Sequence, residues 1–376
     1  MRKVARLGAA VALAASIMGA ALPAAAQDIP VMSISALTGP AAFAGVVETN
    51  GIRLAFDEAN EKGYLGPAKV RLIEGDNATD KAQAISLAEQ AIKRHNVVLS
   101  LGPTVSPDAL AIAPIFNEAK TPMISFATSN AITQAGPYVF RIQMSPSETV
   151  PPLVKYISEK VKARKVAVVY DRSNDAFVEG KKIFEEAMKA AGNPVVAEEA
   201  VLGKDTNFLP LVTKLTSMDI DGIYFVALVE QAANIMIQLK QAGLPDKVRF
   251  FGEQGLASPR LTAIGGRAVE GTLFPGQYLA GVDRPLNRAF EQAYKARYKS
   301  DPDFFAAIGY SAGLVALRAL KDAGPSPTRE TVRNALEKLR DVPVVVGSGL
   351  WNHKDRNGLY GVVITTVKDG KFAVAP

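Results

Sequence analysis

From residue 31 onward, short runs of apolar and β-branched residues alternate with stretches that have helical periodicity. KVRLIEGD (69–76) precedes the helical segment 80–95, and VVLSLG (97–102) precedes a helix that begins near Ser106. Strands that are apolar without interruption are typical of a parallel sheet covered by helices on both faces. This alternation therefore predicts an α/β layer structure.

The alternation restarts after the turn-rich stretch MSPSETVPP (144–152). KVAVVYD (165–171) opens a second series of strands and helices of similar size. Toward the end, helices dominate between Asn287 and Leu339, and the segment 359–374 resembles a hairpin around Asp369-Gly370. A chain of 376 residues is long enough for two such units, so we expect two lobes.

The first 26 residues have the pattern of a cleaved secretory signal peptide. Arg2, Lys3 and Arg6 precede an apolar stretch, and Ala24 to Ala26 provide a cleavage site after Ala26. The alternative, a membrane anchor, is disfavoured because the apolar stretch is short. We therefore expect an exported, periplasmic protein whose net charge falls from +6 to about +3 on cleavage.

Several function classes lack their sequence signals. The small net charge argues against a nucleic-acid partner, and the absence of cysteine excludes disulfides and thiolate chemistry. GYSAGL, from Gly309, comes closest to a serine-hydrolase elbow, but its serine lies inside a helical pattern. We find no phosphate-binding glycine loop. His95 and His353 stand outside any metal-spacing cluster, and we expect both to be solvated.

Carboxylates at Glu74, Asp76 and Asp80 follow a strand, where a metal or glycosidase site could lie. We interpret them as solvated groups around a helix start, with Asp80 as the cap. We therefore expect neither a metal nor a cofactor. The sequence favours a receptor for a small molecule over an enzyme.

The stretch LGPTVSPDALA (101–111) leaves two interpretations of Ser106 open. The serine can be an ordinary helix N-cap before Pro107 and Asp108. Alternatively, a strand that leads through Gly102 and Pro103 into a helix N-terminus presents free N–H groups to an anion.

Segments along the whole mature chain resemble the periplasmic leucine/isoleucine/valine-binding-protein family, the type I substrate-binding proteins of ABC importers. The resemblance rests on these segments in their order: ALTGPAAFAG, ANEKGYLG, GPTVS, PMISFATSNAIT, YVFRI, KVAVVYD and FFGEQG. It implies two Rossmann-like lobes joined by a three-crossing hinge that closes on a ligand. Lobe 1 would hold residues 27–145 and 278–357, and lobe 2 residues 146–277 and 358–376.

The resemblance also implies a ligand site at the carboxyl ends of the strands. By the family pattern, Ser106, Ala127 and Thr128 would hold the ligand's carboxylate. Other expected contacts are Phe43, Ala44, Phe177, Leu228, Glu253, Gln254 and Tyr278. The partners would be a small carboxylate and a membrane permease, and we expect a monomer.

The chain departs from the family where amino-acid-binding members hold the ligand's ammonium group. Their glutamate falls on Gln254, and their two tyrosines fall on Leu228 and Phe177. A buried ammonium without a carboxylate partner is unfavourable by several kcal/mol. We therefore expect an aromatic or otherwise apolar carboxylic acid as the ligand.

Three alternatives remain open at this stage. One is a ligand-sensing domain of a signalling protein, which shares this fold and would need a separate membrane partner. Glu253 could receive an ammonium group, which would restore an ordinary branched-chain amino-acid site. A protein of another class, a hydrolase of esters or amides with its site in the cleft, would need the base and the nucleophile elbow that the sequence lacks.

Overall fold

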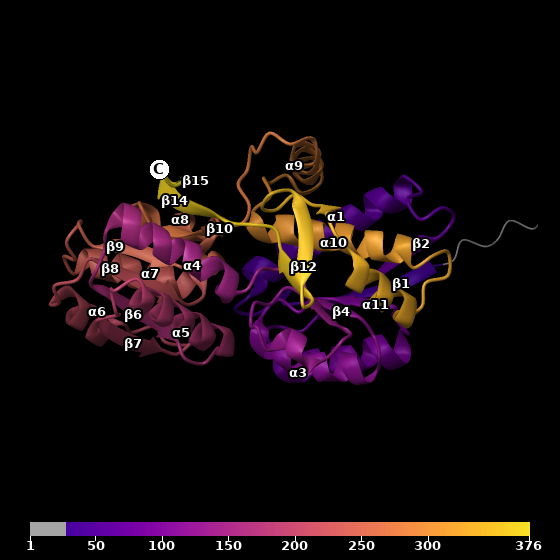
Figure 1. Ribbon diagram of the computed structural model, residues 1–376, viewed down its shortest axis with the longest axis horizontal. Helices are drawn as coiled ribbons and strands as arrows, with labels where there is room; N and C mark the ends of the chain where they lie inside the picture. The colour runs from indigo at the N-terminus through magenta and orange to yellow at the C-terminus, as the bar shows by residue number, and fades with distance from the viewer. Residues whose placement is uncertain (1–27) are drawn as a thin grey trace, which may run out of the picture.

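The computed structural model describes residues 28–376, which form two lobes that lie side by side, each built on one sheet (Figure 1). This confirms the predicted architecture of two α/β lobes. The predicted signal peptide, residues 1–26, lies outside the described residues.

Lobe 1 contains a sheet of eight strands in the order β11-β12-β13-β5-β4-β3-β1-β2. The first five strands along the chain pair in parallel, as their apolar runs predict. The strands are β1 Asp28–Ser35, β2 Lys69–Asp76, β3 Leu99–Leu101, β4 Met123–Ser125, β5 Val139–Arg141, β11 Val342–Pro343, β12 Leu350–Lys354 and β13 Asn357–Leu359.

Helices cover both faces of this sheet. One face carries α2 (Lys81–Glu89) and α3 (Ser106–Glu118), and the other carries α1 (Ala42–Glu61), α9 (Pro285–Tyr298), α10 (Phe304–Asp322) and α11 (Arg329–Lys338). The short turns η1 (Gln90–Arg94) and η2 (Ile132–Ala135) complete the lobe.

Lobe 2 contains a sheet of seven strands in the order β15-β14-β10-β9-β8-β6-β7. The strands are β6 Val166–Asp171, β7 Ala197–Val201, β8 Gly222–Val226, β9 Arg249–Gly252, β10 Leu273–Gly276, β14 Val363–Lys368 and β15 Lys371–Val374. The predicted terminal hairpin is confirmed, because β14 and β15 pair antiparallel.

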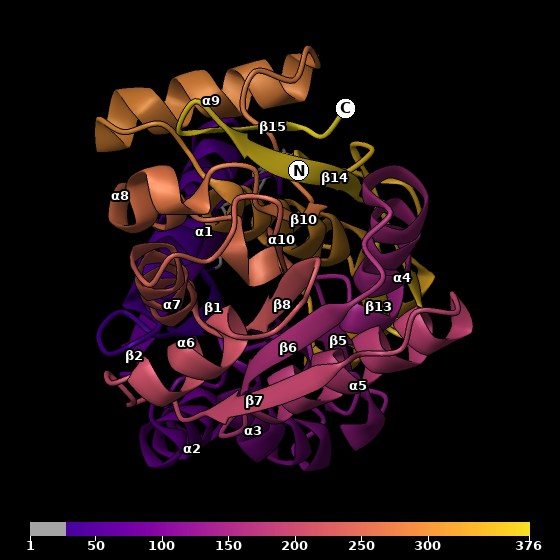
Figure 2. The same ribbon diagram turned by 90° about the vertical axis from the view of Figure 1, so that its left-hand side faces the viewer.

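The sheet of lobe 2 also lies between two layers of helices (Figure 2). One layer holds α4 (Pro146–Tyr156) with η3 (Ile157–Val161) and α5 (Asp175–Ala190). The other holds α6 (Leu209–Thr216), α7 (Val229–Gln241) and α8 (Arg260–Gly265), with the turns η4 (Gln254–Leu256) and η5 (Gly266–Val269).

The chain passes between the two sheets three times, after β5, after β10 and after β13. The side chains of Gln143, Gln277 and Tyr360, one from each crossing, are buried. The Tyr360 hydroxyl donates a hydrogen bond to Gln277 Oε1, which ties the second crossing to the third. The exact lobe boundaries given above stay predictions.

The carboxylates that follow β2 have structural partners. Asp80 caps α2 by accepting a hydrogen bond from the Gln83 N–H at 2.9 Å. Asp76 accepts bonds from the backbone and hydroxyl of Thr38, and Glu74 pairs with Arg53 at 2.8 Å. These groups organise the start of α2 and the turn before α1.

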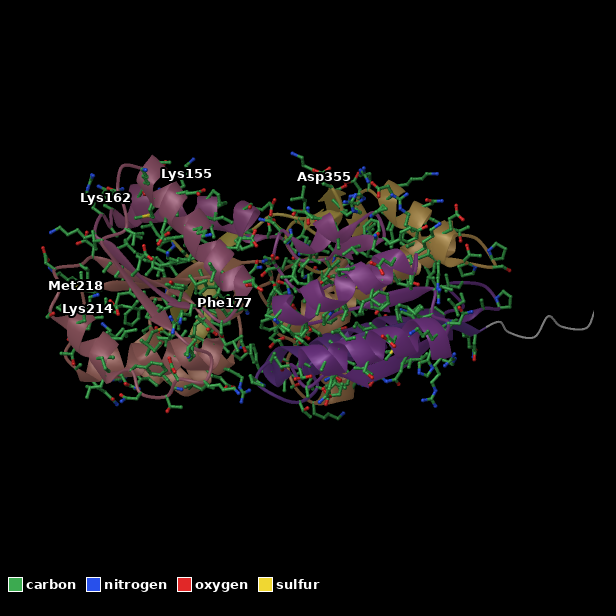
Figure 3. All side chains as sticks on the ribbon, turned by 90° about the horizontal axis from the view of Figure 1, so that it is seen from below. Lys155, Lys162, Phe177, Lys214, Met218 and Asp355 are labelled. Carbon is green, nitrogen blue, oxygen red and sulfur yellow. The ribbon has the colours of Figure 1, made fainter. Side chains whose placement is uncertain are left out.

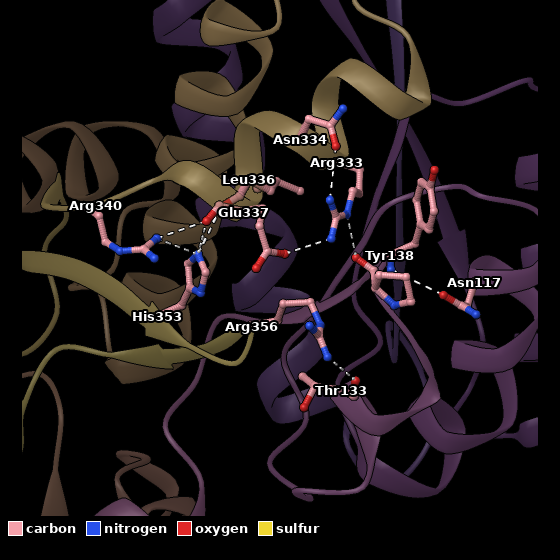
Figure 4. Close-up of polar contacts among 11 residues, drawn as sticks. Asn117, Thr133, Tyr138, Arg333, Asn334, Leu336, Glu337, Arg340, His353 and Arg356 are labelled. Atoms are coloured by element: carbon pink, nitrogen blue, oxygen red, sulfur yellow. Dashed lines mark hydrogen bonds and ion pairs between the residues drawn. The ribbon is translucent and has the colours of Figure 1, made fainter.

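The last part of lobe 1 is fastened to its first part by arginine side chains (Figure 4). Arg333 donates to the carbonyl of Pro137 at 3.1 Å, and Arg356 donates to the carbonyl of Thr133 at 3.1 Å. The expectation that His353 is solvated is wrong. Its ring lies buried on β12 within 3.2 Å of the Leu336 and Glu337 carbonyls, and burial lowers its pKa.

Helices α1 and α10 pack at backbone contact in lobe 1. By length and composition α10 could cross a membrane, but 83% of its apolar window is buried in the core. Gly51 faces the carbonyl of Ala306, and Gly309 faces the carbonyl of Glu48, so neither position has room for a Cβ. The two glycines therefore set the close approach of the two helices.

Gly309→Ala should lower the free energy of unfolding by about 1–3 kcal/mol, because the added methyl overlaps the Glu48 carbonyl and forces the helices apart. Urea unfolding followed by circular dichroism measures the loss. Gly255→Ala is the control, since its Cβ would meet open space. Equal stabilities of the two variants would contradict the packing argument.

Candidate ligand-binding site

A cavity of about 630 Å³, counting its opening to solvent, lies between the two lobes. Nine of the ten predicted site residues line it: Phe43, Ala44, Ser106, Ala127, Thr128, Phe177, Leu228, Glu253 and Gln254. They come from both lobes, and Figure 3 shows Phe177 at the edge of lobe 2 that faces lobe 1. The structure thus brings together segments that are far apart in the sequence.

The N-termini of five helices open on this cavity. Lining residues lie at the starts of α1, α3 and α10 in lobe 1, and of α5 and α7 in lobe 2. A helix N-terminus carries partial positive charge and free N–H groups. Among residues 28–376, no lysine, arginine or histidine lines the cavity. The cavity therefore favours an anion through backbone groups.

Ser106 is not the N-cap of α3. Val105 occupies the cap position, and Ser106 is the first helical residue. The Ser106 hydroxyl instead accepts hydrogen bonds from the N–H groups of Thr128 at 3.3 Å and Ser129 at 3.2 Å. Within the part of the chain that the structure describes, its hydroxyl hydrogen donates to no acceptor. Ser106 thus joins the start of α3 to the loop of residues 126–131, which we name the β4–η2 loop.

Arg141 supports the β4–η2 loop from behind. Its side chain is 0% exposed, and Nη1 donates to the carbonyls of Thr128 at 2.5 Å and Ser129 at 2.7 Å. Burial lowers the pKa of this guanidinium to about 10, so it stays charged at neutral pH. Arg141 lies in the segment YVFRI, and nothing in the neighbouring sequence indicates this role.

Glu253 and Gln254 form the lobe 2 end of the cavity. Burial raises the pKa of Glu253 to about 8. Its Oε1 lies against Gly180 and accepts a long hydrogen bond, 3.5 Å, from the Tyr224 hydroxyl. Gln254 Nε2 donates to the carbonyl of Met144 at 3.1 Å, in the first crossing. Gln254 is therefore tied to the hinge, whereas Glu253 carries a poorly partnered carboxyl group.

Aromatic rings supply much of the remaining wall. Phe43 meets Phe305 edge to face with ring centroids 5.5 Å apart, and Phe126, Phe177 and Phe304 also line the cavity. Sequence reasoning missed Thr104, Gln143, Asn174, Phe304 and Phe305. The aromatic pair could have been found, because Asp303 caps α10 directly before it.

Tyr278 does not line this cavity, contrary to expectation. It borders a separate hollow beside the second and third crossings. Its hydroxyl donates to Glu291 Oε1 at 3.1 Å and its ring packs on Phe290, because the chain after β10 leaves the sheet toward α9. Within residues 28–376, no group of three or more histidine and acidic residues could hold a metal ion.

Comparison with known proteins places this geometry in a family. Residues 28–371 match the model of the periplasmic binding protein family. The leucine-specific-binding protein of Salmonella typhimurium is 27% identical over 361 residues, 93% of this chain and 94% of its own length.

Solved structures have the same fold. A leucine-binding protein of Thermotoga maritima is 27% identical with a TM-score of 0.86, covering 93% of this chain and 98% of that one. A solute-binding protein of an ABC transporter from Rhodopseudomonas palustris BisB5, in complex with 3,4-dihydroxybenzoic acid, is 23% identical with a TM-score of 0.83 and covers 92% and 95% of the two chains. The chain belongs to the periplasmic binding protein family, as a solute-binding protein of the branched-chain-amino-acid type of ABC transporter and not an enzyme.

Proposed function

We propose that this protein, exported by cleavage after Ala26, traps a small carboxylic acid with an aromatic or otherwise apolar body. It then delivers the acid, as a monomer, to the membrane permease of an ABC importer. The observation that carries the proposal is the cavity itself. Five helix N-termini open on it, and no basic side chain of the described residues lines it. Closure of the two lobes on the acid would complete the site.

The carboxylate is assigned to the lobe 1 side of the cavity. The Ser106 hydroxyl and the start of α3 lie beside Thr128, and the only bonds of Ser106 Oγ among the described residues are those it accepts from the β4–η2 loop. Each hydrogen bond to a charged group contributes about 1.5–3 kcal/mol. Two hydroxyls and a helix end are therefore enough to bind a carboxylate.

The body of the ligand is assigned to the aromatic wall. Phe43, Phe177 and Phe305 line the cavity from both lobes, and such rings favour a flat apolar body through area and edge-to-face contacts. The Rhodopseudomonas palustris protein binds an aromatic acid, which supports this assignment as an example of what the fold accommodates.

A branched-chain amino acid is the second candidate, and Glu253 favours it. This buried carboxyl has only the long bond from Tyr224 among the described residues, and an ammonium group would give it the missing counter-charge. The leucine-binding relatives support the same candidate. The two candidate ligands require different protonation states of Glu253: the apolar acid requires the neutral carboxyl group, and the amino acid requires the ionised one.

Ser106→Ala combined with Thr128→Val should weaken binding of any carboxylate ligand by at least about 100-fold, because two charge-assisted bonds are lost. Isothermal titration calorimetry with 4-hydroxybenzoate and with leucine measures the loss. Thr128→Val alone, which leaves the Ser106 bonds to the loop in place, should lose about tenfold.

Thr213→Val with Ser217→Ala is the matched control and should bind like the wild type, because Thr213 is exposed on α6 and Ser217 is exposed at its C-cap. Melting temperatures show whether each variant is folded. A folded double variant with unchanged affinity would remove Ser106 and Thr128 from the ligand site.

The pH dependence of binding should separate the two candidates. With a pKa of about 8, Glu253 is mostly neutral at pH 6 and ionised at pH 9. An apolar acid requires the neutral form, so its affinity should be flat below pH 8 and fall above it. An amino acid requires the ionised form, so its affinity should rise about tenfold per pH unit from pH 6 toward pH 8.

Calorimetry from pH 6 to pH 9 gives these profiles, and Glu253→Gln should flatten whichever profile is found. A profile that keeps its slope in Glu253→Gln would show that another group titrates. Detectable binding of leucine but of no aromatic acid would reject the first candidate.

A further inference from the structure

Lobe 2 contacts the β4–η2 loop directly through the side chain of Glu179 on α5. Glu179 Oε2 accepts a hydrogen bond from the Ser129 hydroxyl at 2.9 Å and one from the Asn130 N–H at 3.1 Å. The Asn130 side chain adds a second link, since its Nδ2 donates to Ser147 Oγ of α4 at 2.8 Å. These bonds join the two lobes at a loop that also lines the ligand cavity.

Arg141 lies on the other side of the same loop. Its guanidinium holds the carbonyls of Thr128 and Ser129, while Glu179 takes the N–H of Asn130. The peptide groups of the loop therefore lie between a buried cation of lobe 1 and a carboxylate of lobe 2. Such charge-assisted hydrogen bonds are shorter and stronger than neutral ones.

Separation of the lobes would have different effects on the two charged side chains. Glu179 would pass into water, whereas Arg141, which is 0% exposed, would stay buried in lobe 1 and lose one of the two carboxylates, Glu148 and Glu179, that act on it. Removing one partner from a buried charged network weakens the compensation of the remaining charge and is unfavourable. The contact thus favours the arrangement in which the two lobes meet.

We propose that Glu179 is a positioning residue that holds the β4–η2 loop against lobe 2 and so stabilises the closed arrangement of the lobes. It acts on the ligand only through the loop that carries Ala127 and Thr128. The inference goes beyond the proposed function and holds for either ligand class.

The absence of cysteine from the chain makes the lobe separation directly measurable. Lys155 on α4 and Lys338 on α11 are exposed. Spin labels attached at Lys155→Cys and Lys338→Cys report the distance between the lobes by pulsed electron paramagnetic resonance. Glu179→Gln keeps the size of the side chain and removes its charge. Glu186→Gln, exposed on the same helix, is the matched control.

In protein without added ligand, Glu179→Gln should lower the ratio of closed to open molecules about tenfold, and Glu186→Gln should leave it unchanged. Ser129→Ala should lower this ratio by a smaller factor, because it removes one of the bonds to Glu179. The double variant Ser129→Ala/Glu179→Gln should have the same ratio as Glu179→Gln alone. Identical distance distributions in the wild type and Glu179→Gln, including both fully open, would overturn the proposal.

Binding of 4-hydroxybenzoate and leucine to the same labelled proteins keeps this test separate from the proposed function. A wild type that binds neither probe, but loses its closed population in Glu179→Gln, would count against the proposed ligands and support the role of Glu179. If the wild type binds a probe, but Glu179→Gln has the same distances as the wild type, the result would support the proposed ligands and count against the role of Glu179.

Discussion

The bond from the buried Arg141 guanidinium to the carbonyls of Thr128 and Ser129 is the interaction on which the site depends. It fixes the β4–η2 loop from behind, so the N–H groups of the loop face away from Arg141, toward Ser106 and Glu179. One loop thereby joins the start of α3, the ligand cavity and the opposite lobe. A buried cation near the cavity also favours an anionic ligand without being exposed to it.

The topology places the remaining parts of the site. In a parallel sheet with helices on both faces, each strand leads into a helix, so the carboxyl ends of strands and the N-termini of helices meet at one edge. The two sheets present these edges to each other, which is why five helix starts open on one cavity. This arrangement favours an anion, and in the proposed function the class of ligand depends on a few side chains such as Glu253 and Phe177.

Much of this arrangement could be predicted from the sequence, because apolar periodicity is local. The alternation of strands and helices predicted the two sheets, and the family pattern predicted nine residues that line the cavity. The failures have a tertiary origin. His353 is buried by helix α11, and the path of the chain after β10 carries Tyr278 away from the cavity toward α9. Nothing in the residues next to each of them signals these contacts.

In the proposed complex, the start of α3 and the β4–η2 loop hold a carboxylate ligand between the lobes. A crystal structure of the protein saturated with the acid that raises its melting temperature most tests this directly. We expect carboxylate oxygens within hydrogen-bond distance of the Ser106 and Thr128 hydroxyls, with the ligand body against Phe177. A ligand whose carboxylate points toward Gln254, or which lies in the hollow beside Tyr278, would contradict it.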